Sequence, residues 1–422
     1  MRQRLTRASY PSYNAFARES RFQGIVLPPD AEQLKARVIE EVDAQRDALI
    51  DLSLRIHDNP ETGFQETNAC AWLCAYLRDH GFSVEQPFCD LATAFRATAG
   101  EETPQVAFLA EYDALAGLGH ACGHNLIAAA STGAAVAVKS VLTETGGGVA
   151  AVGTPAEEVY GGKAIMAARG AFDGCDAAML VHPGSRNAAL TAALACATLT
   201  VEYFGKEAHA ASRPEAGINA LDALVFGYNA VAALRQHIRQ TARVHGIISD
   251  GGQMPNVVPN HSQAVFLVRA EDEAYLEDLK RRVVACFEAG ATAAGARLEC
   301  RWDEVQYAPL RANRALADAF RRNMTSLGRT TTESANPRAL GSTDVGNVSV
   351  LIPTIHPSIA LAHDVNIHTT DFARLAASEA GHRALLDAAK ALATTAVDVL
   401  VDAELRDRMW DEFRSGPPAG EP

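Results

Sequence analysis

Two hydrophobic patterns alternate along the first part of the chain. Apolar residues that recur at intervals of three and four predict amphipathic helices over residues 31–59 and 66–80. Short, continuous apolar runs are typical of buried strands, and they occur at 105–109, 147–153 and 176–181. Since an alanine-rich helix is also predicted over 126–138, we expect an α/β fold with a central, mostly parallel sheet flanked by helices.

A different pattern begins with TLTVEYFG (198–205), where apolar and polar residues alternate as in a half-buried strand. The elements predicted next are a helix over 219–239, strands over 244–248 and 263–268, and a helix over 273–289. The first pattern resumes with a helix over 315–327. We therefore expect an inserted α+β lid domain, 193–309, within a discontinuous main domain, 31–192 and 310–415.

Length and charge narrow the class of partner. A chain of 422 residues can bury a large core and is expected to split into two domains. Its formal net charge of −13 argues against nucleic acid and anionic membranes as partners, because both attract basic patches. No apolar run reaches the roughly 20 residues that cross a bilayer. A small molecule is therefore the expected ligand.

Cysteine usage and the N-terminus bear on location. Eight cysteines are scattered without the spacing of a disulfide scaffold, which indicates free thiols in a reducing compartment. The first eighteen residues carry four arginines and no acid, a faint likeness to a transit peptide, but they lack the apolar segment of a signal peptide. We expect a cytoplasmic protein with a leader that ends near Pro28 and a disordered Gly/Pro-rich tail after Ser415.

The stretch FLAEYDALAGLGHACGHNLIAAA (108–130) places candidate chemistry between a predicted strand and a predicted helix, where open α/β sheets carry their sites. A lone cysteine or histidine is more often an ordinary core residue. Here Cys122 and His124 flank one glycine, so a thiolate and an imidazole can converge on one metal ion. His120 is a weaker candidate, because it can position its neighbours instead.

Further candidates follow the later apolar runs. Glu157 and Glu158 come after the second run, and two adjacent carboxylates in a cleft need a cation, so that one can bind an ion and the other can act as a base. Gly161 and Gly162 allow a tight turn, and the rival reading of a phosphate-binding loop lacks the Walker pattern. His182 follows the third run, as a metal ligand or as a residue that caps the sheet end.

The C-terminal part adds three histidines within thirteen residues, His356, His363 and His368, after the segment GSTDVGNVS (341–349). Chance clustering can supply two of them. At least one is expected to be a ligand near the C-terminal edge of the sheet.

Taken together, these motifs resemble the M20 metallopeptidases and amidohydrolases, in particular the branch of aminobenzoyl-glutamate hydrolase subunits and mammalian M20 dipeptidases. The resemblance extends from about residue 31 to residue 400. It rests on DLSLRIHDNPETGFQE, LAEYDALAGLGHACGHN, GTPAEE, VHPG, FGKEAHAA with GINALDA, NVVP, GSTDVGNVS and IHTTDF.

The resemblance implies roles for individual residues. The implied metal ligands are Cys122, His124, Glu158, His182 and His368. Glu157 would be the general base, and Asp113 would tune a ligand or that base. His209 matches a lid histidine that reaches the active site of a partner subunit and stabilises the oxyanion, so a homodimer or higher homo-oligomer is implied. Candidate substrate contacts are Asn256, Arg269 and His356; for Asn256 and Arg269 the plain alternatives are a strand-end turn and a surface charge.

Three positions depart from patterns of the wider clan. Glu111 stands where many members have histidine, which weakens the expectation of a two-metal site. Ala116 stands in place of a usual proline. Asn125 stands where the branch of auxin-conjugate hydrolases has aspartate.

The expected activity is metal-dependent hydrolysis of an amide bond in a small N-acyl amino acid or dipeptide-like substrate. Cys122 favours Zn²⁺ and the carboxylates tolerate Mn²⁺, and either ion would activate a water whose proton Glu157 takes. Two alternatives stay open. One is a hydrolytic deaminase of an aminoaromatic compound that uses the same site. The other is a non-catalytic metal- or amino-acid-binding protein; the adjacent pair Glu157 and Glu158 counts against it, because a binding protein would gain little from a second carboxylate beside the ion.

Overall fold

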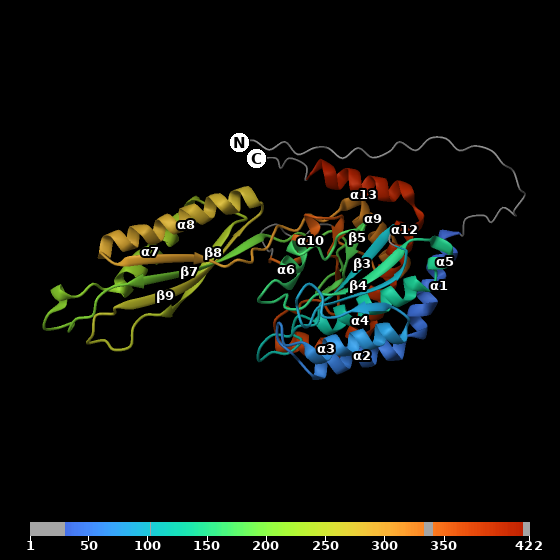
Figure 1. Cartoon of the computed structure of the whole chain (residues 1–422), viewed down its shortest axis with the longest axis horizontal. Helices are drawn as coiled ribbons and strands as arrows, with labels where there is room; N and C mark the ends of the chain where they lie inside the picture. The colour runs from blue at the N-terminus through green and yellow to red at the C-terminus, as the bar shows by residue number, and fades with distance from the viewer. Residues whose placement is uncertain (1–29, 102, 333–340, 417–422) are drawn as a thin grey trace, which may run out of the picture.

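The computed structural model describes residues 30–101, 103–332 and 341–416, which form two lobes (Figure 1). The predicted arginine-rich leader and nearly all of the predicted Gly/Pro-rich tail lie outside these residues. All eight cysteines are free thiols, as their spacing predicts. Across the described ranges, no helix has the length and apolar character needed to cross a membrane.

The first lobe is built on a six-stranded sheet. Its strands, in spatial order, are β1 (Ser83–Glu85), β2 (Phe95–Gly100), β4 (Gly148–Gly153), β3 (Gln105–Ala110), β5 (Ala177–Met179) and β11 (Thr354–Ile355). The last four run parallel to one another, whereas β2 is antiparallel to both of its neighbours. The predicted mostly parallel sheet is therefore confirmed, with an antiparallel edge.

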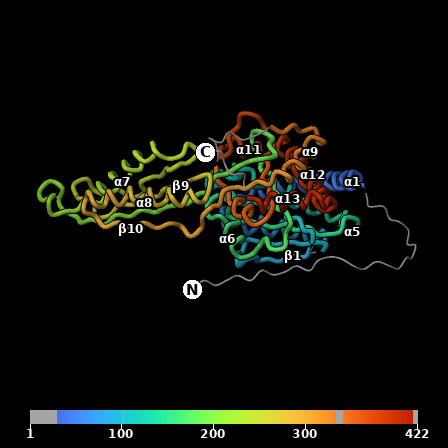
Figure 2. Tube along the Cα trace, turned by 90° about the horizontal axis from the view of Figure 1, so that it is seen from above, coloured from blue at the N-terminus to red at the C-terminus, as the bar shows by residue number. Residues whose placement is uncertain are grey.

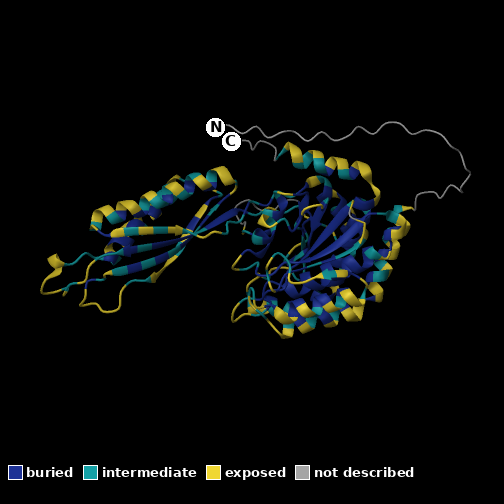
Figure 3. Cartoon of the chain, viewed as in Figure 1, coloured by how far each residue is buried: buried dark blue, intermediate teal, exposed yellow. Residues whose placement is uncertain are grey.

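Both faces of this sheet are covered, which explains why its central strands read as continuous apolar runs (Figure 3). Alternate residues of β3 enter different cores: Phe108 packs with α4 (His124–Lys139) and α12 (Glu379–Val401), while Leu109 packs with α6 (Gly162–Ala168) and α10 (Val345–Ser349). The other helices of this lobe are α1 (Ala31–Ala44), α2 (Arg46–Asp58), α3 (Thr67–Asp79), α5 (Leu142–Thr145), α9 (Arg314–Ser326), α11 (Thr370–Ala376) and α13 (Ala403–Ser415).

The prediction of one helix over 31–59 is wrong, because the chain breaks it at Gln45 into α1 and α2. Gln45 ends α1: its backbone N–H and its side-chain amide both donate to the carbonyl of Glu41. No proline or glycine marks this break. The side-chain oxygen of Gln45 also accepts a hydrogen bond from Tyr76 of α3, a tertiary contact that apolar periodicity does not reveal.

The second lobe is a four-stranded antiparallel sheet with two long helices, as expected for an α+β block. In spatial order its strands are β10 (Arg297–Trp302), β7 (Ala195–Phe204), β9 (His261–Ala270) and β8 (Arg243–Asp250), and its helices are α7 (Ala220–Leu234) and α8 (Glu273–Ala294). It has its own hydrophobic core and extends away from the first lobe (Figure 2). All these elements fall inside the predicted insertion, 193–309, whose exact limits stay a prediction.

Three parallel strands of the first lobe end at the same edge. The last residue of β3, Ala110, lies opposite the last residue of β4, Gly153, and Phe108 lies opposite the end of β5. The chain leaves these strands toward the second lobe through loops that begin at 111, 154 and 180. A short parallel pair, β6 (His182–Gly184) with β12 (Ser358–Ala360), follows at this edge. This is the place where α/β sheets assemble side chains into a site.

Candidate metal centre and active site

The loop after β3 brings Cys122 and His124 to the buried edge of the sheet. His124 is the first residue of α4, and the residue before it, Gly123, has a left-handed backbone with φ of 80°. A Cβ at Gly123 would lie 2.7 Å from Cγ of Pro183, the residue that follows His182. Glycine is therefore required here for two reasons, and it lets the Cys-Gly-His turn pack directly against the segment that carries His182.

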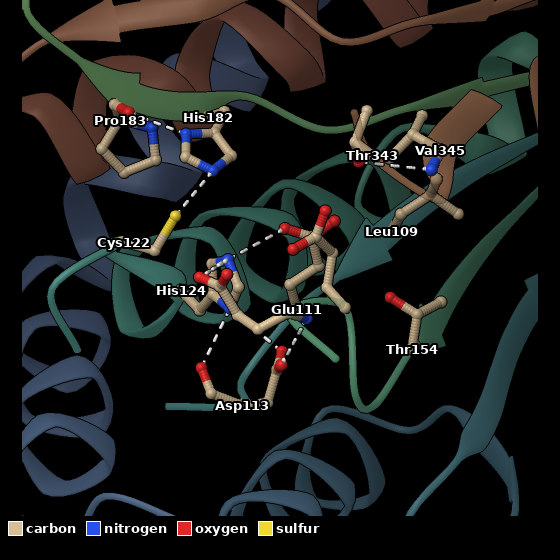
Figure 4. Close-up of polar contacts among 12 residues, drawn as sticks. Leu109, Glu111, Asp113, Cys122, His124, Thr154, His182, Pro183, Thr343 and Val345 are labelled. Atoms are coloured by element: carbon tan, nitrogen blue, oxygen red, sulfur yellow. Dashed lines mark hydrogen bonds and ion pairs between the residues drawn. The ribbon is translucent and has the colours of Figure 1, made fainter. Parts of the chain in front are cut away.

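Asp113 fixes the orientation of His124 (Figure 4). The Nδ1 atom of His124 lies 3.0 Å from Oδ1 of Asp113 and 2.9 Å from its carbonyl oxygen, so Nδ1 carries a proton and Nε2 is the nitrogen that could bind a metal ion. The other carboxylate oxygen of Asp113 accepts the backbone N–H of Glu158 at 3.0 Å. Asp113 thus positions two of the predicted ligands, which agrees with the role that the resemblance implies.

The five predicted metal ligands converge. Donor atoms that lie within 4.8 Å of one another form three groups: Cys122, His124 and His182; Cys122, Glu158 and His368; and His124, Glu157 and Glu158. The Sγ atom of Cys122 lies 3.4 Å from Nε2 of His182, and Nε2 of His368 lies 3.3 Å from Oε1 of Glu158. Two ligands of one tetrahedral zinc ion are roughly 3.4 Å apart, so these separations fit a shared cation.

The electrostatics of the ligands also fit a metal ion. The Nε2 atom of His124 is buried and has no hydrogen-bond partner among the described residues, and the carboxylates of Glu111 and Glu158 lie 3.6 and 3.8 Å from it. Burial lowers the pKa of His182 and raises the pKa of the Cys122 thiol. Although burial opposes its charge, the hydrogen bond from His368 and the neighbouring His124 hold the pKa of Glu158 at about 2. A bound cation would favour the thiolate of Cys122.

Glu157 lies beside this cluster without being needed to complete it. Burial, together with the carboxylates of Glu111 and Asp344, raises the pKa of Glu157 well above its ordinary value. Its carbonyl oxygen accepts a hydrogen bond of 2.8 Å from the hydroxyl of Tyr307. The residue before it, Ala156, has a positive φ of 60°, and such strained backbone tends to cluster at functional sites. A carboxyl group with a raised pKa can both take up and return a proton near neutral pH.

A pocket of about 990 Å³ opens above these residues and is lined by both lobes. Arg269 of β9 lines it and donates to the hydroxyl of Ser342 at 2.8 Å, while its Nε atom has no partner among the described residues. His356 also lines it, with its ring centroid 5.3 Å from that of His182. Both were predicted as substrate contacts, and both are placed where a small molecule can reach them.

His209 and Asn256 are not among the described residues that line the pocket. They lie close to each other, because the N–H of Ala210 donates to the carbonyl of Asn256. The loops that carry them, 205–219 and 251–260, occupy the end of the second lobe farther from the first lobe (Figures 1 and 2). Since β7 spans ten residues, that end is roughly 30 Å from the start of the strand. Their predicted roles thus stay predictions that require a second subunit.

A buried ion cluster that the sequence does not predict lies beside the ligands. The ammonium of Lys163 lies 2.7 Å from Oε1 of Glu111 and 2.8 Å from Oδ1 of Asp344, and all three side chains are fully buried. These contacts occupy the Lys163 ammonium, which removes the charge that a phosphate-binding loop would use. The only signal in the sequence was indirect: GGK at the start of α6 and GSTDVGN are both polar segments next to apolar ones.

Comparisons with known proteins identify the family of this chain. Peptidase family M20/M25/M40 matches residues 101–391. The Xaa-Arg dipeptidase of Mus musculus is 38% identical over 401 residues, covering 91% of this chain and 93% of that protein. One of the subunits of the p-aminobenzoyl-glutamate hydrolase of Escherichia coli (strain K12) is 30% identical over 454 residues, covering 88% of this chain and 93% of that protein.

A solved structure supports the fold. The YXEP protein of Bacillus subtilis, described as a dinuclear metal-binding peptidase from the M20 family, superposes with a TM-score of 0.67 at 21% identity, over 85% of this chain and 99% of its own. The match to the family spans more than half of the chain, and both relatives named above are hydrolases. The resemblance seen in the motifs is confirmed, and the chain is a hydrolase that belongs to peptidase family M20/M25/M40.

Proposed function

We propose that this enzyme hydrolyses the amide bond of a small N-acyl amino acid or dipeptide-like substrate. The observation that carries the proposal is a chain of overlapping groups of metal-ligating side chains, four of which line a pocket together with Glu157. The proposed ligands are Cys122, His124, Glu158, His182 and His368. The proposed ion is Zn²⁺, which suits the thiolate, or Mn²⁺, which suits the carboxylates.

The proposed chemistry assigns the proton transfers to Glu157. When bound, a divalent ion polarises the scissile carbonyl and lowers the pKa of water toward about 7. Glu157 takes the proton of the attacking water and returns it to the leaving nitrogen, a cycle that its raised pKa favours. Tyr307 holds the backbone of Glu157 through its hydrogen bond, so the base keeps its position through both transfers.

Arg269 is the proposed contact for a substrate carboxylate. The names of the two relatives describe amides of arginine and of glutamate, whose shared feature is the α-carboxylate of the terminal amino acid. A guanidinium group binds carboxylate through two parallel hydrogen bonds, and Nε of Arg269 has no partner among the described residues. We therefore propose that the leaving amino acid is held by its carboxylate at Arg269.

We further propose that the enzyme works as a homodimer through the second lobe. Large apolar side chains are exposed on α7 and on β8, the edge strand of its sheet: Val225, Phe226, Ile247 and Ile248. An exposed, apolar edge strand favours pairing with a second chain. In that assembly His209 would donate to the developing oxyanion in the partner's pocket, and Asn256 would lie beside it. The free cysteines suit a reducing, cytoplasmic setting.

Product analysis tests the proposed activity. A panel of dipeptides, N-acyl amino acids and aminoaromatic compounds is incubated with enzyme reconstituted with Zn²⁺ or Mn²⁺, and products are identified by mass spectrometry. A free amino acid is the expected product, and Glu157→Gln should abolish its release while the bound metal is retained. Release of ammonia alone would instead identify a deaminase, and no turnover on any compound would leave a binding protein.

The cross-subunit role of His209 has its own test. Glu157→Gln and His209→Ala each inactivate a different component, so a dimer that contains one chain of each has one intact site. Mixing and refolding the two inactive variants should restore up to a quarter of wild-type activity per chain. If activity is not restored, or if light scattering shows a monomer, His209 does not act across subunits.

A further inference from the structure

The turn that follows β4, residues 154–158, is held in place through its backbone. Asp113 and Tyr307 bind peptide groups of its last two residues. A third contact comes from Glu66, 90 positions earlier in the chain, whose Oε1 atom accepts the N–H of Ala156 at 2.8 Å. Three consecutive residues of the turn, the middle one being Glu157, are therefore fixed by side chains from three separate segments.

Glu66 is a buried acceptor and not a helix cap. It precedes α3, a position where a polar side chain usually binds the first N–H groups of the helix, but its carboxylate makes no such bond. The side chain is fully buried, and its second oxygen, Oε2, accepts the hydroxyl of Thr93 at 3.0 Å. A buried carboxylate is costly unless its oxygens are paired, and here both oxygens have a partner.

Ala156 is the residue of the turn that most needs such support. Its φ of 60° is in the left-handed region, which alanine rarely adopts, and strained backbone of this kind persists only where its surroundings impose it. The segment that carries Glu66 meets Ala156 a second time, since a Cβ at Gly63 would lie 3.0 Å from that of Ala156. Because Glu157 comes next in the chain, a change of backbone at Ala156 would turn the Glu157 side chain away.

We propose that Glu66 is a positioning residue for Glu157: by holding the N–H of Ala156, it keeps the strained turn in the conformation that directs the Glu157 carboxyl group into the pocket. This assignment rests on the proposed function, in which Glu157 transfers the protons. In the described part of the chain Glu66 does not line the pocket and belongs to none of the groups of metal-ligating side chains, so it acts through the backbone. A base that is misplaced by about 1 Å can lose about a hundredfold in rate.

Two variants of Glu66 separate the reach of its side chain from its charge. Glu66→Gln keeps the length and an oxygen that can accept the Ala156 N–H, whereas Glu66→Asp keeps the acid but is one methylene too short. Steady-state kinetics are measured on Zn²⁺-loaded enzyme with an amide that the wild type cleaves. We expect kcat to fall about ten- to hundredfold in Glu66→Asp and less than about threefold in Glu66→Gln, while KM and zinc content stay within about twofold of the wild type in both.

Glu61→Asp is the matched control. Glu61 belongs to the same segment and its carboxylate accepts the N–H groups of Asn68 and Ala69 at 3.0 Å, but none of its described hydrogen bonds reaches the turn. Its kcat should stay within about twofold of the wild type. Should Glu66→Asp fail to fold, Glu66→Met replaces it, because methionine keeps the length, offers no acceptor to Ala156 and buries no charge.

A selective loss of kcat in the variant that cannot reach Ala156, with activity kept in Glu66→Gln and in the control, supports the proposal. Equal kcat values in the two Glu66 variants overturn it, and so does a loss of zinc that matches the loss of kcat. A wild type that cleaves no amide refutes the proposed function, and crystal structures of the wild type and Glu66→Asp then decide the role of Glu66 alone. A shift of the Glu157 carboxyl group by more than about 0.5 Å is expected, and a smaller shift overturns the proposal.

Discussion

Replacing Lys163 with methionine isolates the energetic role of the buried ion cluster. Lys163→Met keeps an unbranched side chain of similar length but removes the ammonium that the buried carboxylates of Glu111 and Asp344 share. Removing one member of a buried ion pair typically destabilises a protein by about 3–5 kcal/mol. Among the described ion pairs, that of Asp344 involves Lys163 alone, whereas Glu111 also lies 3.6 Å from Nε2 of His124.

The loss in the free energy of unfolding at a given pH can be estimated, because a buried carboxylate without its cation can take up a proton. At pH 7, protonating a carboxyl group whose ordinary pKa is 4.5 requires about 3.4 kcal/mol, and at pH 5 it requires about 0.7 kcal/mol. In the variant the pKa of this carboxyl is raised, so its stability contribution is complete below pH 4.5 and is lost as the pH rises through the raised pKa. The predicted loss is therefore about 3–4 kcal/mol at pH 7 and about 1 kcal/mol at pH 5.

Urea unfolding followed by tryptophan fluorescence at pH 7 and pH 5, with a chelator present, measures both values. Lys35→Met is the control, because Lys35 forms a partly exposed pair with Asp398 that contributes about 1 kcal/mol or less. The reasoning is refuted if Lys163→Met loses less than 1 kcal/mol at pH 7. An equal loss at both pH values would refute it too, because it would show that the buried carboxylates are not responsible.

Three further predictions concern other contacts. Tyr307→Phe removes the donor to the Glu157 carbonyl, and kcat should fall about three- to tenfold with KM unchanged, a change that steady-state kinetics would reveal and an unchanged kcat would contradict. Arg269→Ala should raise KM at least tenfold for a substrate with a free carboxylate but not for its carboxamide analogue; equal effects on the two would exclude a carboxylate contact at Arg269. Burial raises the pKa of Glu66 to about 7, so the stability that its protonated carboxyl group contributes is lost as the pH rises from 4.5 to 7. Glu66→Gln has no such loss, so its melting temperature should rise relative to that of the wild type from pH 5 to pH 8; parallel curves in scanning calorimetry would rule this out.

The fold could be predicted from the sequence where one local pattern determined each element. The apolar run of β3 and the alanine-rich α4 are buried nearly all round, so hydrophobicity alone marks them. The break at Gln45 could not be predicted in this way, because it depends on hydrogen bonds to Glu41 and to Tyr76 of another helix. Tertiary contacts override a periodicity that runs through the break.

The sequence predicted the candidate metal ligands but not the residues that hold the site residues in position. Cys122 and His124 lie two residues apart on one loop, and the motifs around Glu158, His182 and His368 identify the other ligands by resemblance. The pair Lys163–Asp344 joins residues 181 positions apart, and neither residue carries a local sign that it is buried. Tyr307 likewise reaches Glu157 across 150 positions. Such contacts arise only when the chain is folded.

The metal content of purified protein tests the central claim most directly. Protein loaded with Zn²⁺ is passed through a desalting column, and bound metal is counted by inductively coupled plasma mass spectrometry for the wild type, His124→Ala and Glu158→Ala. The convergence of ligands predicts at least one ion per wild-type chain and a substantial loss in both variants. Wild-type protein without bound zinc, or variants that retain as much zinc as the wild type, would contradict it.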